Sequence, residues 1–509
     1  MRRLISFFVL LLSLVCTLDA KSQQGSRLTP ADKAARYFES IRKSPPQQLA
    51  FLLKMPKGGD LHSHLSGAIY AESYIQWAAD NGLCINSKTL SVTSAQPCDE
   101  KSDRVPASQA LRNSVLYRQL IDAWSMRNWQ LSGQSGHDHF FDTFGRFGAA
   151  TANQTGRMLA EAVARAARGQ VLYVEFMLTP DGAASSLIGE RIGWDKSETT
   201  LEKLKTNGIA EAAKSAITNL RSAEVEKDRL LKCGSPEADA GCSVTIRYIA
   251  QVSRGSSLGV VFAQMVTGFA LANDPDSKVV ALNLVQPEDG VGSMQNFSLH
   301  MQMLKFLRPL YPHAHLSLHA GELAPGLTPP EGLSFHVHDS VLVAGADRIG
   351  HGVDIMHERD PYDLLREMAK RNVMVEICLT SNDTILGITG AEHPLAMYLE
   401  YGVPVALATD DEGVARSEMS REFLRAANDQ GLGYLQLKKM ARNSLEYAFI
   451  SGTSLWSDAR KSVPVAQCAR DFETMRLTTN ECQAFIKTSE KAALQWRLEE
   501  QLRNFEIQY

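Results

Sequence analysis

The chain has 509 residues, of which 44% are hydrophobic and 22% are charged, and its formal net charge is −4 at pH 7. This is an ordinary composition for a soluble protein. No block of lysine and arginine stands out, so the sequence lacks the electrostatic footprint of a nucleic-acid-binding protein and we expect no nucleic-acid partner.

The first twenty residues are typical of a secretory signal peptide. Two arginines precede an apolar run from Leu4 to Val15, and small residues follow up to Ala20. Such a run is too short to span a membrane comfortably. We therefore expect cleavage near Ala20 and an exported protein, periplasmic or extracellular, with no membrane partner once the signal is removed.

The cysteines fall into local pairs. The chain has eight, of which Cys16 lies in the signal peptide. Because an exported chain meets oxidising conditions, we predict three disulfides, which are Cys84–Cys98, Cys233–Cys242 and Cys468–Cys482. Cys378 lies inside an apolar run and is interpreted as a buried free thiol. No C-x-x-C spacing exists, which excludes a zinc finger.

Helical and strand-like segments follow one another along the chain. A polar leader and a helix from Thr29 to about Arg42 occupy 21–48. Eight strands are predicted, at 59–65, 171–178, 244–252, 279–285, 315–320, 347–351, 373–379 and 403–408. The last is a continuous apolar run that suits a strand buried on both faces. Helical patterns occur at 70–80, 108–131, 139–152, 202–231 and 360–370. Eight strands separated by helices predict the α/β class and a (β/α)₈ TIM barrel.

The barrel is expected to carry helical insertions and a C-terminal helical extension. We assign it to 49–452, with insertions at about 84–108 and 181–242. The extension covers 453–509 and is expected to end in a helix from Glu481 to Phe505.

Polar residues gather at the ends of several predicted strands. The run VPVALATDDEGV at 403–414 ends its apolar part in Asp410 and Asp411. Two carboxylates at a buried strand end are costly unless a cation or hydrogen bonds hold them. Other strand ends carry His62 and His64, His319 and Glu322, and His351. Because the C-terminal strand ends of such a barrel meet on one face, these residues indicate a metal site there.

The position of each histidine along the barrel separates ligands from structural residues. His62 and His64 project to the same side of one strand, and His319 lies at the top of another. With Asp410 they form a set that suits one Zn²⁺ and leaves a position for water, whose pKa zinc lowers. Three further pairs, 137/139, 313/315 and 336/338, are predicted to be structural or to lie on the opposite rim.

Five ordered motifs resemble the adenosine deaminase family, the zinc-dependent branch of the metal-dependent hydrolase barrels. They are GDLHSHLSG at 59–67, SLHAGE at 317–322, RIGHG at 348–352, Ser381-Asn382 and TDD at 409–411, with NSLEYAFISG at 443–452 resembling the helix after the barrel. The resemblance covers about 50–452, and the signal peptide, insertions and cysteine pairs bring the chain closest in character to secreted members.

The resemblance implies hydrolytic deamination of adenosine or 2′-deoxyadenosine to the inosine product and ammonia. His62, His64, His319 and Asp410 would hold one zinc ion, and the water that it activates would attack C6 of the purine. Glu322 would protonate N1. His351 would assist the water's deprotonation and stabilise the developing charge. Asp411 would orient the water and contact N7. The residues expected to contact the substrate are His64, Ser66, Gly67, Gln286 and Asp411.

Three departures from the family pattern leave the substrate open. Ser66 stands where members commonly carry an acidic residue that contacts the ribose, and it bonds more weakly than a carboxylate. Gln286 and Pro287 stand where a glycine usually meets purine N3, and Glu412 replaces a common proline. Adenine or an N6-substituted aminopurine is therefore an alternative substrate.

A secreted nucleoside-binding or signalling protein that has lost catalysis is a further alternative. The intact set Glu322, His351 and Asp411 argues against it. The expected partners are a small purine nucleoside and water, and no oligomeric state is predicted.

Overall fold

The computed structural model describes residues 28–99, 101 and 103–509, so the expected signal peptide lies outside the described residues. Its centre is an eight-stranded parallel sheet in the order β1-β5-β6-β7-β8-β9-β10-β11. A parallel bridge between Ser63 and Asp410 joins the ends of the first and last strands. There the Asp410 N–H donates to the His62 carbonyl at 2.8 Å. The predicted (β/α)₈ barrel is confirmed.

The eight barrel strands lie within a few residues of the strands predicted from the sequence. They are β1 Gly58–His64, β5 Val171–Leu178, β6 Thr245–Ser253, β7 Val279–Val285, β8 His315–Ala320, β9 Arg348–His351, β10 Met374–Ile377 and β11 Val405–Leu407. Strands covered on both faces read as continuous apolar runs, which is why the sequence locates them. The seventh was predicted too long, because Leu379 already begins helix α14 (Leu379–Leu386).

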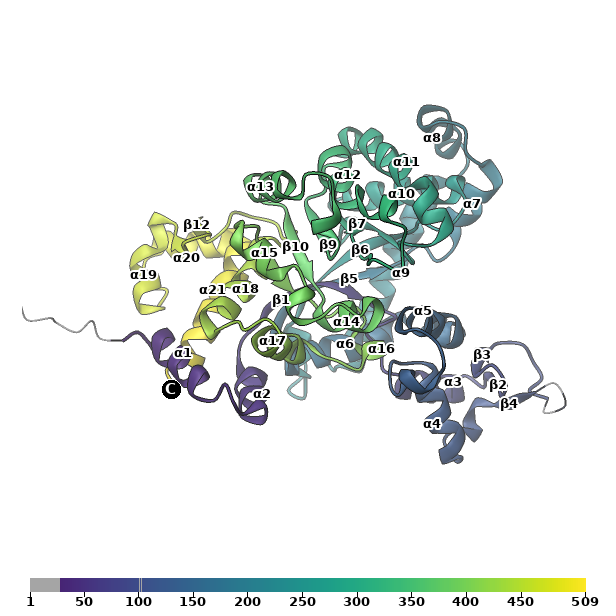
Figure 1. Cartoon of the computed structure of the whole chain (residues 1–509), viewed down its shortest axis with the longest axis horizontal. Coiled ribbons are helices and arrows are strands. Elements are labelled where there is room, and N and C mark those ends of the chain that lie inside the picture. Colours follow the sequence, from purple (N-terminus) through teal and green to yellow (C-terminus); the bar gives the residue numbers. More distant parts are fainter. Residues whose placement is uncertain (1–27, 100, 102) are drawn as a thin grey trace, which may run out of the picture.

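Helices surround the strands, as Figure 1 shows. Those that follow barrel strands include α6 Thr155–Arg168, α10 Leu258–Ala272, α11 Val291–Leu307, α13 Pro361–Arg371, α15 Leu395–Glu400 and α18 Tyr434–Glu446. Helix α10 is apolar and buried around almost its whole circumference. It packs against β6 and β7 on one side and α7 (Ala184–Ile192) on the other.

The segment between β1 and α6 projects from one side of the barrel (Figure 1). It contains α3 Ala71–Asp80, a small antiparallel sheet of β2 Cys84–Asn86, β3 Ser91–Thr93 and β4 Arg104–Pro106, and helices α4 Ser114–Ala123 and α5 Gly136–Phe147. The helix predicted over 108–131 is wrong in extent, because Asn113 caps α4 and Asn128 and Gly133 adopt positive φ beyond its end. Helix α5 begins before 139 because the Ser135 side chain caps it.

Two long predicted helices are each broken in two. The segment 202–231 forms α8 Ser197–Lys205 and α9 Ile209–Leu230, separated at Gly208, whose φ is +95°. The terminal helix forms α20 Asn480–Thr488 and α21 Glu490–Glu506. Ser489 between them has extended backbone, and its hydroxyl accepts from the Ala492 N–H. In each case a residue suited to starting a new helix interrupts a continuous helical pattern.

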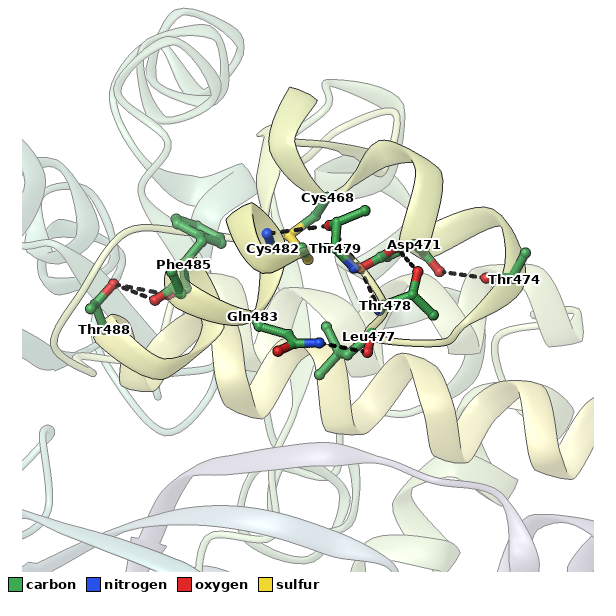
Figure 2. The surroundings of a disulfide bond; sticks show 11 residues. Cys468, Asp471, Thr474, Leu477, Thr478, Thr479, Cys482, Gln483, Phe485 and Thr488 are labelled. Atoms are coloured by element: carbon green, nitrogen blue, oxygen red, sulfur yellow. Dashed lines mark hydrogen bonds between the residues drawn. A yellow bond between two sulfur atoms is a disulfide. The ribbon is translucent and has the colours of Figure 1, made fainter.

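The C-terminal elements lie beside the N-terminal helices α1 Pro30–Ser40 and α2 Pro45–Lys54 (Figure 1). Helix α21 packs on α18 and α1. All three predicted disulfides form, and Cys378 is a buried free thiol as expected. Figure 2 shows the third disulfide, beside which the Asp471 carboxylate accepts hydrogen bonds from Thr478 and Thr479. Within 28–99, 101 and 103–509, no helix has the length and apolar character needed to cross a membrane.

Candidate active site

Four side chains from three strand ends converge at one end of the barrel. His62 and His64 belong to β1, His319 to β8, and Asp410 follows β11. The Nε2 atom of His319 lies 3.1 Å from Nε2 of His62 and 3.3 Å from Nε2 of His64. Asp410 Oδ1 lies 3.3 Å and 3.4 Å from the same two nitrogens. The structure therefore brings together the four residues that the sequence predicts as metal ligands.

The donor atoms of this cluster fit a zinc ion. Tetrahedral zinc binds imidazole nitrogen and carboxylate oxygen at about 2.0–2.2 Å, which places the donors roughly 3.3–3.6 Å from one another. The four distances here run from 3.1 to 3.4 Å. Asp410 Oδ1 is also buried without a hydrogen-bond donor. A buried carboxylate oxygen facing nitrogen lone pairs is costly unless a cation lies between them, so these residues are suited to hold a metal ion.

Hydrogen bonds at the far side of the His62 and His319 rings orient the lone pairs of these two residues. His62 Nδ1 lies 2.6 Å from Glu376 Oε2, and His319 Nδ1 lies 2.9 Å from Asn283 Oδ1. An Nδ1–H that donates to either oxygen leaves the lone pair on Nε2, where a cation would sit. These partners are the outer support that metal-binding histidines commonly have.

The charges of the cluster are adjusted by burial and by neighbours. Burial lowers the pKa of His64 to about 4 and holds the pKa of His319 well below its usual range, so both rings are neutral. Burial also opposes the charged form of His62, but the nearby carboxylates of Asp410 and Glu376 outweigh it and raise the His62 pKa to about 10. A cation entering the cluster would displace this proton, because metal ligands must be deprotonated.

A buried network supports Glu376 from the interior of the barrel. The carboxylate accepts from Ser317 Oγ at 2.7 Å and Arg348 Nε at 2.6 Å, and Arg348 also pairs with Glu175. Burial would raise the pKa of Glu376, but Arg348 and His62 bring it down to about 2. Sequence reasoning missed these residues, although the acids that interrupt the apolar runs 171–178 and 373–379 were a visible signal.

Close packing around His62 depends on Gly350 of β9. A Cβ at this position would stand 2.6 Å from His62 Cε1, so the ring would have to move. We predict that Gly350→Ala lowers the affinity for Zn²⁺ by about 10- to 100-fold, as loss of outer support does at metal sites. Competition with a chromophoric chelator measures this. The matched control is Gly148→Ala, where a Cβ meets nothing within 4 Å; equal affinity in the two variants would contradict the packing argument.

The three predicted catalytic side chains lie beside the four donors. Glu322 follows β8, His351 ends β9 and Asp411 follows Asp410. His351 Nε2 lies 3.7 Å from Glu322 Oε1. Both His351 Nε2 and Asp411 Oδ1 are buried without a hydrogen-bond partner. Unpaired buried polar atoms of this kind mark groups that are kept for a ligand or a reaction.

The environment keeps Glu322 protonated near neutral pH. Burial is the largest cause, and the nearby carboxylates of Asp410 and Glu288 add to it, so the pKa of Glu322 rises to about 8. Burial and the adjacent Asp410 likewise hold the pKa of Asp411 well above its ordinary range. A protonated carboxyl in this position can donate a proton to a bound molecule.

Glu288 fixes the backbone that carries Glu322. Its carboxylate accepts from the N–H groups of Gly321 at 3.0 Å and Glu322 at 2.9 Å, and from His336 Nδ1 at 2.5 Å. The sequence analysis did not identify Glu288 as a backbone anchor. His336 therefore holds the Glu288 carboxylate in place, which agrees with the structural role predicted for it.

Three residues at the strand ends adopt left-handed backbone conformations. The φ angles are 81° for Gln286, 69° for His351 and 57° for Asp410. Such conformations cost roughly 1–3 kcal/mol each in a residue with a side chain and cluster at functional sites. Gln286 thus has the backbone geometry that glycine favours.

A cavity of about 480 Å³ opens above the four donors. Its lining consists of His64, Ser66, Phe140, Phe141, Asp142, Phe144, Gln251, Ser253, Val285, Gln286, Pro287, His319, Glu322, Asp410 and Asp411. The predicted substrate residues His64, Ser66, Gln286 and Asp411 are among them, whereas Gly67 packs against Asp411, where a Cβ would stand 1.4 Å from Oδ1. The size lies within the range of roughly 300–1,000 Å³ typical of small-molecule sites.

Helix α5 contributes an aromatic wall that the sequence analysis did not assign. Phe140, Phe141 and Phe144 line the cavity opposite polar groups from the strand ends. In the sequence, the only indication of this wall was that the three phenylalanines lie close together within one predicted helix. Aromatic faces of this kind suit a flat heterocyclic ligand.

The remaining histidine pairs lie away from the donors. His139 is buried with Nε2 3.1 Å from the carbonyl oxygens of Asp122 and Ser125, and His338 pairs with its neighbour Asp339. His315 opens β8 and stacks on Phe449. These positions agree with structural roles.

Comparisons with known proteins relate the chain to deaminases. Residues 130–455 match the family model described as Adenosine deaminase. An adenosine deaminase from Escherichia coli is 38% identical over 138 residues, which cover 27% of this chain and 38% of that protein. One from Pectobacterium atrosepticum is 36% identical over 175 residues, covering 34% and 47%. The alignments thus span less than half of these relatives' length.

Solved structures share the fold at low sequence identity. An adenine deaminase from Arthrobacter aurescens superposes with a TM-score of 0.51 at 18% identity, covering 80% of this chain and 96% of that one. An N6-methyl-AMP deaminase from Arabidopsis thaliana gives 0.50 at 20% identity, covering 79% and 94%. A Burkholderia ambifaria amidohydrolase with bound zinc gives 0.50 at 16% identity, covering 95% and 97%. By its fold, its converging strand-end donors and the family match over most of its length, the chain belongs to the adenosine deaminase family.

Proposed function

We propose that this protein hydrolyses the 6-amino group of adenosine and 2′-deoxyadenosine, giving the corresponding inosine and ammonia with one zinc ion per chain. The observation that carries the proposal is the position of Glu322. This protonated carboxyl lines the same cavity as His64, His319 and Asp410 of the donor cluster. An acid and a metal site in one pocket are the two groups that nucleophilic replacement of an aromatic amino group requires.

The residues of the chain have separate tasks in this reaction. Zinc held by the four donors would supply the Lewis acidity that makes water nucleophilic near neutral pH. Glu322 gives its proton to ring nitrogen N1, so that C6 accepts the water oxygen. Asp411 orients that water and contacts N7, and His351 contacts the oxygen as charge develops on it. The amino group takes up the proton that the water has lost and leaves C6 as ammonia.

The charges lining the cavity favour an unphosphorylated substrate. Among the described residues that line it there is no lysine or arginine, whereas four acids are present, Asp142, Glu322, Asp410 and Asp411. A 5′-phosphate needs cationic or backbone donors, which bidentate arginine supplies best. Arg254 is nearby but is fully buried and does not line the cavity; its Nε donates to the Gln286 carbonyl at 2.9 Å, and the side chain faces Glu288. Two solved structures that share the fold contain bound IMP or GMP; in this cavity no lysine or arginine of the lining would meet the phosphate of such a ligand.

Adenine or an N6-substituted aminopurine is a second candidate, which Gln286 favours. Its side-chain oxygen accepts from the Gly255 N–H at 2.9 Å, so the amide fills space at the cavity wall. Ser66 in turn offers a neutral hydroxyl rather than a carboxylate for a ribose hydroxyl.

A substrate panel tests these assignments. We expect ammonia release from adenosine and 2′-deoxyadenosine at comparable kcat/KM. AMP should be slower by at least about 100-fold, a cost of about 3 kcal/mol, since no lysine or arginine of the cavity lining meets its phosphate dianion. Turnover of adenine above that of adenosine would assign the second candidate instead, and preferred turnover of AMP would contradict the charge argument.

We also propose that the protein acts outside the cytoplasm. Support comes from the three disulfides, which persist in oxidising compartments, and from the signal-like segment 1–20.

A further inference from the structure

A chain of hydrogen bonds runs from helix α15 to His351 through two side chains to which no role has been given. His393 precedes α15, Asn382 lies on α14, and His351 ends β9. All three are buried, with exposed fractions of 2%, 0% and 0%. The chain reaches the active site at His351 Nε2.

The contact between Leu395 and His393 determines which atoms donate and which accept along this series of hydrogen bonds. The backbone N–H of Leu395 donates to His393 Nδ1 at 3.1 Å. A backbone N–H can only donate, so Nδ1 carries no proton and the proton of the ring lies on Nε2. Leu395 is the first residue of α15, whose N–H has no partner within the helix, so this contact also completes the helix start.

The donor and acceptor of the next two hydrogen bonds follow from the position of this proton. His393 Nε2 lies 3.1 Å from Asn382 Oδ1, and its N–H must donate to that oxygen. The other end of the same amide, Nδ2, lies 2.9 Å from His351 Nδ1 and donates to it. His351 Nδ1 therefore accepts, and the proton of the neutral His351 ring is placed on Nε2.

From this geometry we infer that His393, acting through Asn382, is a positioning residue that holds His351 as a hydrogen-bond donor toward the reacting oxygen. The inference rests on the proposed deamination and refines it. A ring that presents Nε2–H stabilises negative charge on that oxygen but cannot take a proton at the same atom.

Two substitutions at His393 separate positioning from local structure. In His393→Asn the shorter amide oxygen still reaches the Leu395 N–H but no donor reaches Asn382. In His393→Gln the amide nitrogen takes the place of Nε2 and keeps the donor. We expect kcat to fall about 10- to 100-fold in His393→Asn, the usual effect of losing an outer partner of a functional imidazole. KM and zinc content should stay unchanged, and His393→Gln should retain most of kcat.

Asn382→Asp provides an independent variant. A carboxylate accepts from His351 Nδ1, which moves the ring proton away from Nε2, so kcat should fall at least as far as in His393→Asn. The control is His338→Gln, at a partly exposed histidine paired with Asp339, for which wild-type kcat is expected. A loss of kcat in His393→Gln equal to that in His393→Asn, or an unchanged kcat in Asn382→Asp, would overturn the inference.

A spectroscopic measurement tests the predicted tautomers of His351 and His393 without an activity assay. Two-bond ¹H–¹⁵N spectra of ¹⁵N-histidine-labelled protein report the tautomer of each ring, with His351 and His393 assigned through their Gln variants. We expect the Nε2–H tautomer for both in the wild-type protein and Nδ1–H for His351 in Asn382→Asp. An Nδ1–H tautomer for either ring in the wild type would refute the proposal. If no aminopurine is turned over, the proposed function fails while these spectra still test the inference.

Discussion

Glu322→Gln should remove nearly all deaminase activity while leaving the protein folded and its zinc content unchanged. The amide has the shape of the carboxyl but no proton acidic enough to transfer, and general acid catalysis contributes about 10²- to 10⁴-fold. Ammonia release from adenosine, measured together with metal content, gives the result. Glu331→Gln is the matched control, because Glu331 is an exposed acid on the same loop.

The same carboxyl predicts the alkaline side of the pH profile. Burial and the neighbouring carboxylates raise the pKa of Glu322 to about 8, so the active, protonated form is present below that pH and is lost above it. We expect kcat/KM to fall as the pH rises through this range. Wild-type turnover in Glu322→Gln would remove this residue from the reaction.

His319→Ala should abolish metal binding and with it the activity. The alanine removes one of the converging donors and leaves Asn283 Oδ1 with only the backbone N–H of residue 319 as its hydrogen-bond donor. Because metal affinity depends on the complete ligand set, we expect zinc content below about a tenth of one ion per chain after dialysis. Metal analysis and ammonia release measure the two effects.

His313→Ala is the control for this substitution. His313 belongs to a His-x-His pair but is exposed before β8 begins. It should keep both zinc and activity. One zinc ion retained in His319→Ala would show that the donors identified here are not the ligands.

The barrel and the donors were accessible from the sequence because both depend on local patterns. A strand covered on both faces is a continuous apolar run, and Asp410 stands directly after one. Helix ends were harder to predict from the sequence, because Gly208 and Ser489 interrupt helical patterns of apolar residues that otherwise continue.

The supporting residues depend on contacts between distant parts of the chain. Glu376 lies 314 residues from His62, and His393 reaches His351 only through Asn382. An acid within an apolar strand signals that a buried partner exists, but only the fold identifies the partner. The same holds for the aromatic wall of α5, whose position over the cavity depends on the whole segment between β1 and α6.

Ammonia release from adenosine before and after removal of the metal tests the central claim most directly. The protein is dialysed against a strong chelator, assayed, and assayed again after addition of one equivalent of Zn²⁺. The arrangement of His62, His64, His319 and Asp410 predicts loss of activity on removal and recovery on addition. Undiminished ammonia release from fully metal-free protein would contradict it.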